Sequence, residues 1–134
     1  VNQTLGLIEK EEGIRRISID FRGHGKTIKF GNEDDFSFNT FADDVVALIQ
    51  NLKLEKVNLG GISTGAGVAL NICLRYKNIV NKLILARPAW EDKPQEDFIR
   101  ESFKEIYTSL IDNSVEIAKQ NYVKTEIFNK LNSL

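Results

Sequence analysis

The sequence has few of the residues on which several protein classes depend. Its 134 residues include one cysteine, one histidine and two prolines, and no methionine. A single cysteine excludes an internal disulfide and a cysteine-based zinc site, and a single histidine excludes chemistry that needs two. No apolar run approaches the roughly 20 residues of a membrane-spanning helix. Disulfide-stapled, cysteine–zinc and membrane-spanning classes are therefore not expected.

The charge balance is close to neutral. Lysine and arginine total 18, aspartate and glutamate total 19, and the net charge is −1. No strong field of either sign is present to hold nucleic acid or an anionic membrane. With 42% hydrophobic and 28% charged residues, the composition is that of a globular protein with a core. The polar start at Val1 shows no secretory signal, so we expect a cytoplasmic protein.

Apolar periodicity divides the first two thirds of the chain into alternating helices and strands. Strands are predicted over 15–20, 55–60 and 81–86, and helices over 3–12, from Thr40 to about 52, and from about Ala66 to Tyr76. Thr40, with Asp43 three residues later, predicts the start of the second helix. The alternation is typical of an α/β fold with a parallel sheet flanked by helices. The almost continuously apolar run at 81–86 predicts a strand buried on both faces.

The pattern changes after Pro94 to helix alone. Phe98, Phe103 and Tyr107 lie on one apolar stripe, and later apolar residues predict one or two further helices. We interpret residues 1–92 as an α/β core and residues 93–134 as an all-helical segment.

The motif that carries chemistry is Gly61-Ile62-Ser63-Thr64-Gly65, a G-x-S-x-G sequence between an apolar strand and an apolar helix. This context is typical of a nucleophile elbow, in which a serine lies on a sharp strand-to-helix turn. Strand and helix pass so close that we expect Gly61 and Gly65 to supply the room. We also expect a positive φ at Ser63, and the Thr64 backbone N–H to serve as an oxyanion donor.

With this motif in its setting, the chain resembles the α/β-hydrolase family over roughly residues 14–90. The resemblance rests on Arg-Gly-His-Gly after a strand, an acidic helix, and the elbow about 40 residues later. It implies an esterase-like acyl-enzyme mechanism in which Ser63 attacks a carbonyl, a histidine is the general base and a carboxylate orients it. It also implies a lid over 93–134, whose apolar stripe favours a small, largely apolar acyl substrate, and it implies no cofactor or metal.

Parts of the family's machinery have no counterpart here. The family's catalytic histidine follows the nucleophile, whereas the single histidine, His24, precedes it in a loop where the family's histidine is structural. Glu91 and Asp92 follow the last predicted strand, where some relatives place the acid, so Asp92 is the candidate acid. The strand that would carry the first oxyanion donor is absent. We therefore expect a middle slice of a longer hydrolase, its sheet completed by a missing segment or by self-association.

Other interpretations of the same residues stay open. Ser63 can be a turn serine with no role, and the chain can be a non-catalytic remnant or interaction module that kept the fold and lost the histidine. Gly25-Lys26-Thr27 ends like a phosphate-binding loop, but Asp20 stands where that loop needs a glycine. Asp43 and Asp44 fit a helix cap and a solvated face better than a catalytic carboxylate pair.

Overall fold

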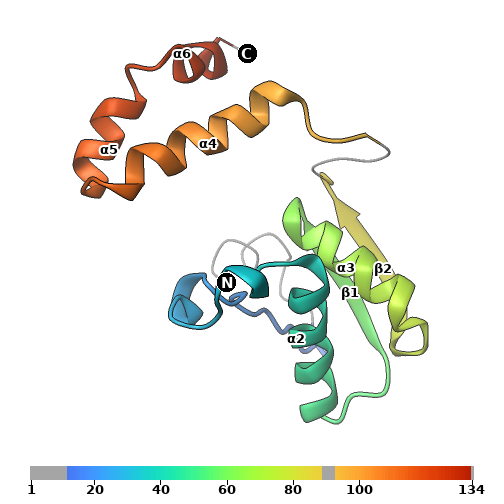
Figure 1. Ribbon diagram of the computed structural model, residues 1–134. Coiled ribbons are helices and arrows are strands. Elements are labelled where there is room, and N and C mark those ends of the chain that lie inside the picture. The colour runs from blue at the N-terminus through green and yellow to red at the C-terminus, as the bar shows by residue number, and fades with distance from the viewer. Residues whose placement is uncertain (1–11, 89–92, 134) are drawn as a thin grey trace. The chain divides into compact units, whose positions relative to one another are not determined.

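A computed structural model describes residues 12–88 and 93–133 of the chain (Figure 1). The chain divides into two compact units, 1–89 and 90–134. The described elements of the first unit are η1 (Gly25–Thr27), η2 (Glu33–Asp35), α2 (Phe38–Asn51), β1 (Val57–Ile62), α3 (Thr64–Arg75), η3 (Lys77–Ile79) and β2 (Val80–Ala86). Those of the second unit are α4 (Asp97–Ile111), α5 (Val115–Tyr122) and α6 (Glu126–Asn132).

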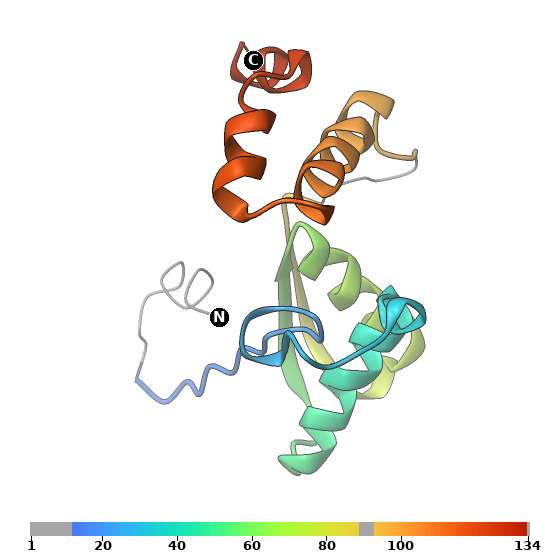
Figure 2. The same cartoon turned by 60° about the vertical axis from the view of Figure 1, so that its left-hand side comes forward.

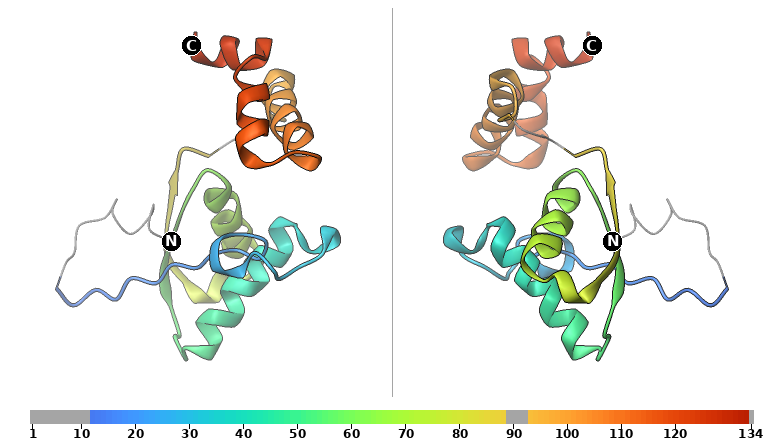
Figure 3. Two further views of the ribbon diagram at one scale, coloured as in Figure 1. Left: turned by 90° about the vertical axis from the view of Figure 1, so that its left-hand side faces the viewer. Right: turned by 90° about the vertical axis from the view of Figure 1, so that its right-hand side faces the viewer.

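The first unit is built on a parallel pair of strands. Leu59 of β1 lies opposite Leu83 of β2, and Ile62 lies opposite Ala86. Helix α3 connects the strands and packs on both, and α2 packs on α3. Both helices lie on the same side of the strands (Figures 2 and 3). The predicted fold class, a parallel sheet with flanking helices followed by helical segments, is confirmed.

Helix α2 begins earlier than its sequence pattern predicts. Its N-cap is Ser37, whose Oγ accepts a hydrogen bond from the Thr40 N–H at 3.1 Å. The prediction of Thr40 as the cap is wrong, because Ser37 already supplies the acceptor that the first helical turn requires. The earlier start adds Phe38 to the helix, and this ring faces α3.

The core of the first unit lies between α2 and α3. Its buried residues are Phe41, Ala42, Val46, Val68 and Ile72. Phe21, from the segment before α2, stacks on Phe41 with ring centroids 5.0 Å apart. A Cβ on Gly67 would stand 2.6 Å from the Phe38 ring. Gly67 therefore leaves the space on α3 that the Phe38 ring of α2 occupies.

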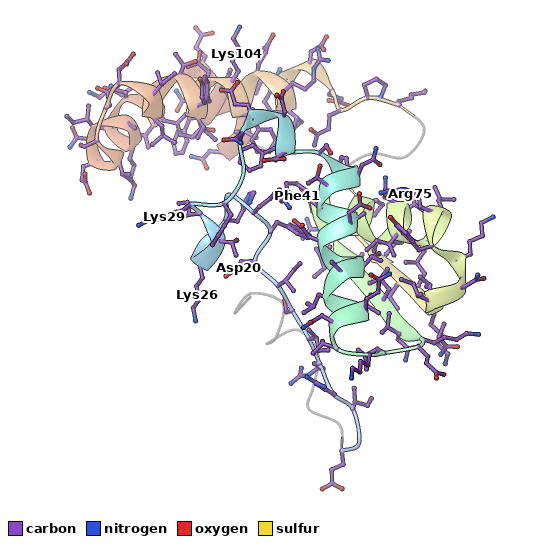
Figure 4. All side chains as sticks on the ribbon, turned by 60° about the horizontal axis from the view of Figure 1, so that its bottom comes forward. Asp20, Lys26, Lys29, Phe41, Arg75 and Lys104 are labelled. Carbon is purple, nitrogen blue, oxygen red and sulfur yellow. The ribbon has the colours of Figure 1, made fainter. Side chains whose placement is uncertain are left out.

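A polar brace of Asp43, Arg75 and Tyr76 ties α2 to the end of α3. The Tyr76 hydroxyl donates to Asp43 Oδ1 at 2.7 Å, and the Arg75 guanidinium lies 2.7 Å from the same oxygen. Figure 4 shows Arg75 on α3. The Tyr76 hydrogen bond and the Arg75 charge lower the pKa of Asp43, and that hydrogen bond raises the pKa of Tyr76. The prediction that Asp43 belongs to a helix cap is therefore wrong, since its carboxylate bridges two helices.

The strand predicted at 15–20 is wrong. Residues 14–21 have no regular secondary structure, and the sheet of the described residues consists of β1 and β2. Alternation such as Ile17 and Ile19 marks an amphipathic segment, but a segment becomes a strand only where a neighbouring backbone pairs with it. The helix predicted at 3–12 lies outside the described residues except for Glu12, which is in a turn.

Strand β2 lies almost where predicted but is not buried on both faces. Ile84 is 62% exposed, because α2 and α3 both lie on the opposite side of the strands (Figure 3). Strand β1 begins two residues later than the predicted 55–60. The apolar run at 81–86 thus predicted the position of the strand correctly, but the prediction that both faces of the strand are buried is wrong.

The second unit is helical. Ser114 caps α5 and Thr125 caps α6, each side chain accepting a backbone N–H from the first turn of its helix. Phe103 and Tyr107, on the apolar stripe of α4, are each 63% exposed. The described helices include none that is long and apolar enough to cross a membrane.

Candidate functional site

Ser63 lies alone between the end of β1 and the start of α3. Its φ is 53° and its ψ is −117°, so the prediction of a positive φ at this residue is confirmed. The Ser63 N–H donates to the Ala86 carbonyl of β2 at 3.1 Å, and its own carbonyl accepts from Ala66 at 2.9 Å and from Gly67 at 3.3 Å. These bonds hold a backbone conformation that a non-glycine residue rarely adopts.

The room for this turn comes from Gly61. A Cβ on Gly61 would overlap the carbonyl of Gly65, so strand and helix pass too close for any side chain at residue 61. A Cβ on Gly65 would meet nothing within 4 Å in the described part of the chain. Within the described residues, the space at this turn therefore depends on Gly61, and the role of Gly65 stays a prediction.

Two backbone donors are available next to the Ser63 hydroxyl. In the described chain, neither the Thr64 N–H nor the Gly65 N–H donates to a protein acceptor, and the Ser63 side chain does not cap α3. The first N–H groups of a helix have no intrahelical partner and favour negative charge. This arrangement suits an oxyanion that forms beside Ser63. The role of Thr64 as its donor stays a prediction.

His24 belongs to a loop that is fastened by its own hydrogen bonds. Its Nδ1 lies 3.0 Å from the Arg22 carbonyl, and the Thr27 hydroxyl donates to the His24 carbonyl at 2.7 Å. Among the described residues no hydrogen bond joins His24 to Ser63. The loop therefore accounts for the one histidine of the chain without involving it in proton transfer at Ser63.

Asp20 closes the other side of this loop (Figure 4). Its carboxylate accepts the Lys26 backbone N–H at 3.1 Å, and this hydrogen bond lowers the pKa of Asp20. A Cβ on Gly25, where φ is +51°, would stand 2.5 Å from the same carboxyl group. A carboxylate inside the turn repels phosphate, which agrees with the exclusion of a phosphate-binding loop on sequence grounds.

Arg22 fixes the loop to α2. Its Nε lies 2.7 Å from Asp44 Oδ2, its NH2 group lies 2.6 Å from Asp44 Oδ1, and Asp35 is 3.5 Å away. This two-point contact raises the pKa of Arg22 and has the geometry of the strong carboxylate–guanidinium pairs. The sequence offered no signal for the pairing, because the two residues are 22 positions apart. The prediction of a simply solvated Asp44 is wrong.

Asp92 and Glu91 lie outside the described residues. The described residues contain no cluster of three or more histidine, cysteine or acidic side chains that could hold a metal ion. A shallow hollow lined by Asp97, Arg100, Glu101 and Lys104 lies along one helix of the second unit and contains none of the elbow residues.

Comparisons with known proteins agree on the fold family. A family model for the alpha/beta hydrolase fold matches residues 7–109. The chain is 32% identical over 119 residues to AB hydrolase superfamily protein YisY of Bacillus subtilis, covering 86% of this chain and 41% of that protein. It is 27% identical over 109 residues to ethanol acetyltransferase 1 of Kluyveromyces marxianus, covering 81% and 27%. It is 34% identical over 83 residues to a Haemophilus influenzae protein named as an esterase/lipase, covering 60% and 28%. The chain thus spans less than half the length of these curated relatives.

Proposed function

Since the chain belongs to the α/β-hydrolase family, we propose that Ser63 is the nucleophile of an esterase-like enzyme that cleaves small acyl esters. The observation that supports the proposal most is the conformation of Ser63. This residue has a φ of 53° and lies between a strand and a helix, as the nucleophile elbow predicts. Strained backbone of this sort is concentrated at functional sites. The names of curated relatives, which include an esterase/lipase, point the same way.

The chemistry proceeds through a covalent acyl-enzyme. Ser63 Oγ attacks the ester carbonyl as its proton passes to a base, and the carbonyl oxygen takes up negative charge beside the Thr64 N–H. The C–O bond to the leaving alcohol then breaks and the alcohol leaves with that proton. Water attacks the acyl-enzyme in the second half and releases the carboxylic acid and the free Ser63 hydroxyl.

The general base is proposed to come from outside residues 1–134. His24, the one histidine of the chain, is hydrogen-bonded within its own loop. The relatives that the chain matches are more than twice its length, which leaves room for a histidine after the nucleophile, as the family requires. Asp92 keeps its place as the candidate acid.

A second candidate is transfer of the acyl group to an alcohol. Among the relatives are proteins named ethanol acetyltransferase 1 and alcohol acetyltransferase, at 27–33% identity. Both activities share the acyl-enzyme on Ser63 and differ only in whether water or an alcohol attacks it. The ratio of free acetate to ethyl acetate, formed from p-nitrophenyl acetate in the presence of ethanol, separates the two.

The proposal is tested by turnover of p-nitrophenyl acetate in the natural protein that carries this sequence. Ser63→Ala should lower kcat about a thousandfold or more, because no nucleophile is left and only oxyanion stabilisation and binding persist. Ser109→Ala, on α4, is the matched control and should leave kcat unchanged. Full activity in Ser63→Ala would contradict the proposal. No turnover in the unmutated protein would favour the non-catalytic interpretation.

A further inference from the structure

Arg87 has a costly backbone conformation that the fold does not account for. Three non-glycine residues have positive φ among those described: Lys53, Ser63 and Arg87. Lys53 closes α2 in a left-handed helix cap, in which the Leu54 N–H reaches the Ile49 carbonyl at 3.1 Å. Ser63 forms the elbow. Arg87, with φ 45°, follows a strand, so a helix cap explains nothing there.

The neighbouring proline makes this conformation still less favourable. Arg87 precedes Pro88, and the residue before a proline is normally extended because the pyrrolidine ring crowds it. Glycine is the residue that adopts a positive φ without a steric penalty. This chain has an arginine at a position whose φ of 45° suits glycine better, and the side chain is what an arginine adds there.

Arg87 follows β2 at the same edge of the sheet as Ser63 follows β1. Ile62 and Ala86 are register partners, so the next residues, Ser63 and Arg87, leave the two strands side by side. The hydrogen bond from the Ser63 N–H to the Ala86 carbonyl, at 3.1 Å, fixes this proximity. Neighbouring strands lie about 4.8 Å apart. Ligands of open α/β sheets bind beyond the carboxyl ends of the strands, which is where both residues stand.

The charge of Arg87 is available to a ligand. The side chains of Arg22, Arg75 and Arg100 each pair with an aspartate, whereas Arg87 is exposed and pairs with no carboxylate of the described residues. A guanidinium presents a rigid fork of donors that matches a carboxylate at two points. Among the described residues, Arg87 thus has a guanidinium with no carboxylate partner next to the proposed nucleophile, and this group is suited to an anion.

We propose that Arg87 binds a carboxylate on the acyl part of the substrate. This inference rests on the proposed function of Ser63. The acyl group becomes attached to Ser63 and is therefore the part of the substrate nearest to the residue that adjoins Ser63 along the sheet edge. The acyl group inferred here is a short chain with a terminal carboxylate, which replaces the largely apolar acyl group expected from the apolar stripe of residues 93–134. Arg87 acts as a specificity-determining residue and takes no part in bond breaking.

The test compares two esters of equal acyl length in the natural protein that carries this sequence. Mono-p-nitrophenyl succinate has a terminal carboxylate, and p-nitrophenyl butyrate is neutral. We expect Arg87→Gln to lower the ratio of kcat/KM for succinate over butyrate by about 10- to 100-fold, the range for a lost charge-assisted hydrogen bond. Lys82→Gln, which removes an equal charge from the middle of β2, should leave the ratio unchanged.

A glycine variant separates the guanidinium from the backbone turn. Arg87→Gly keeps access to the left-handed conformation and should lose the preference for the succinate ester as Arg87→Gln does, while Arg87→Lys should retain part of it. An unchanged ratio in Arg87→Gln and Arg87→Gly would overturn the inference, as would an equal loss for both esters. Undiminished turnover of both esters in Ser63→Ala would instead show that the proposed function itself is wrong.

Discussion

Ser63 holds a conformation that costs on the order of 1–3 kcal/mol for a residue with a Cβ. Its backbone N–H and carbonyl are both engaged, by Ala86 on the strand side and by Ala66 and Gly67 on the helix side. The turn is therefore determined from both of the elements that it joins. The hydroxyl does not cap α3, and within the described ranges the Thr64 and Gly65 N–H groups donate to no protein acceptor.

The two glycines of the motif should respond differently to a methyl group. Gly61→Ala should lower the free energy of unfolding by about 1–3 kcal/mol or more, the cost of overpacking, because its Cβ would overlap the Gly65 carbonyl. Gly65→Ala should be neutral or raise it by up to about 1 kcal/mol, since residue 65 is helical and its Cβ meets open space. Urea unfolding of both variants measures the difference, and equal losses would contradict this geometry.

The sequence predicted the elbow better than it predicted the roles of its neighbours. The G-x-S-x-G spacing and the flanking apolar runs were enough to place a positive φ at Ser63. They could not show that a Cβ on Gly61 would meet backbone while one on Gly65 would meet nothing within 4 Å among the described residues, because that depends on how β1 and α3 pack. No sequence motif marks Arg87. Its positive φ depends on the direction in which the chain leaves β2, and the order of apolar and polar residues does not indicate that direction.

Among the elements, α2 and α3 are joined both by an apolar core and by the brace of Asp43, Arg75 and Tyr76. The brace lies at the surface, so its contribution to stability is small in water and is reduced by salt. The brace matters more for the position of α3. Tyr76 follows the last residue of this helix, so its hydrogen bond to Asp43 fixes the C-terminal end of α3, while the N-terminal end begins at Thr64. The orientation of α3 in turn sets the elbow.

Acid should weaken this brace. The Tyr76 hydrogen bond and the Arg75 charge lower the pKa of Asp43 below its ordinary 3.8, so the folded state favours the carboxylate. Its contribution to stability is therefore fully present above pH 3.8 and is lost as the pH falls through the lowered folded pKa. In urea unfolding, the stability difference between the unmutated protein and Asp43→Asn should be larger at pH 6 than at pH 3.

A control aspartate makes this comparison specific. Asp34→Asn, which changes an exposed aspartate of η2, is measured at both pH values as the matched control. Tyr76→Phe removes the hydrogen-bond donor and should reduce the pH dependence attributed to Asp43. A difference between the unmutated protein and Asp43→Asn that stays constant from pH 6 to pH 3 would show that Asp43 does not titrate as described.

The apolar pattern predicted the bounds of a helix or strand correctly where the apolar residues are the ones that pack in the fold. The run at 81–86 gave β2 to within one residue, because a parallel strand is apolar wherever one face packs on a helix. The N-cap of α2 was misplaced by three residues, since Ser37 and Thr40 are both good N-caps and the fold uses the first. The strand at 15–20 failed for a non-local reason: pairing depends on another strand, and the run itself cannot reveal whether one is beside it.

On the scale of the whole molecule, the 134 residues contain the proposed nucleophile, one proposed oxyanion donor and a single histidine, which precedes that nucleophile in the chain. The family match covers residues 7–109, while the chain spans 41% of YisY and smaller shares of the acetyltransferases. The described sheet has two strands, and Ile84 is largely exposed on the face that neither α2 nor α3 covers. The activity is accordingly proposed for the natural protein that carries this sequence.

The central claim is that Ser63 is an activated nucleophile, and covalent labelling tests it most directly. The natural protein that carries this sequence is treated with a fluorophosphonate, which reacts with serines made nucleophilic by a base, and the adduct is located by peptide mass spectrometry. We predict one adduct, on Ser63, that is absent in Ser63→Ala and retained in Ser109→Ala. Ester turnover that the reagent abolishes without modifying Ser63 would contradict the account.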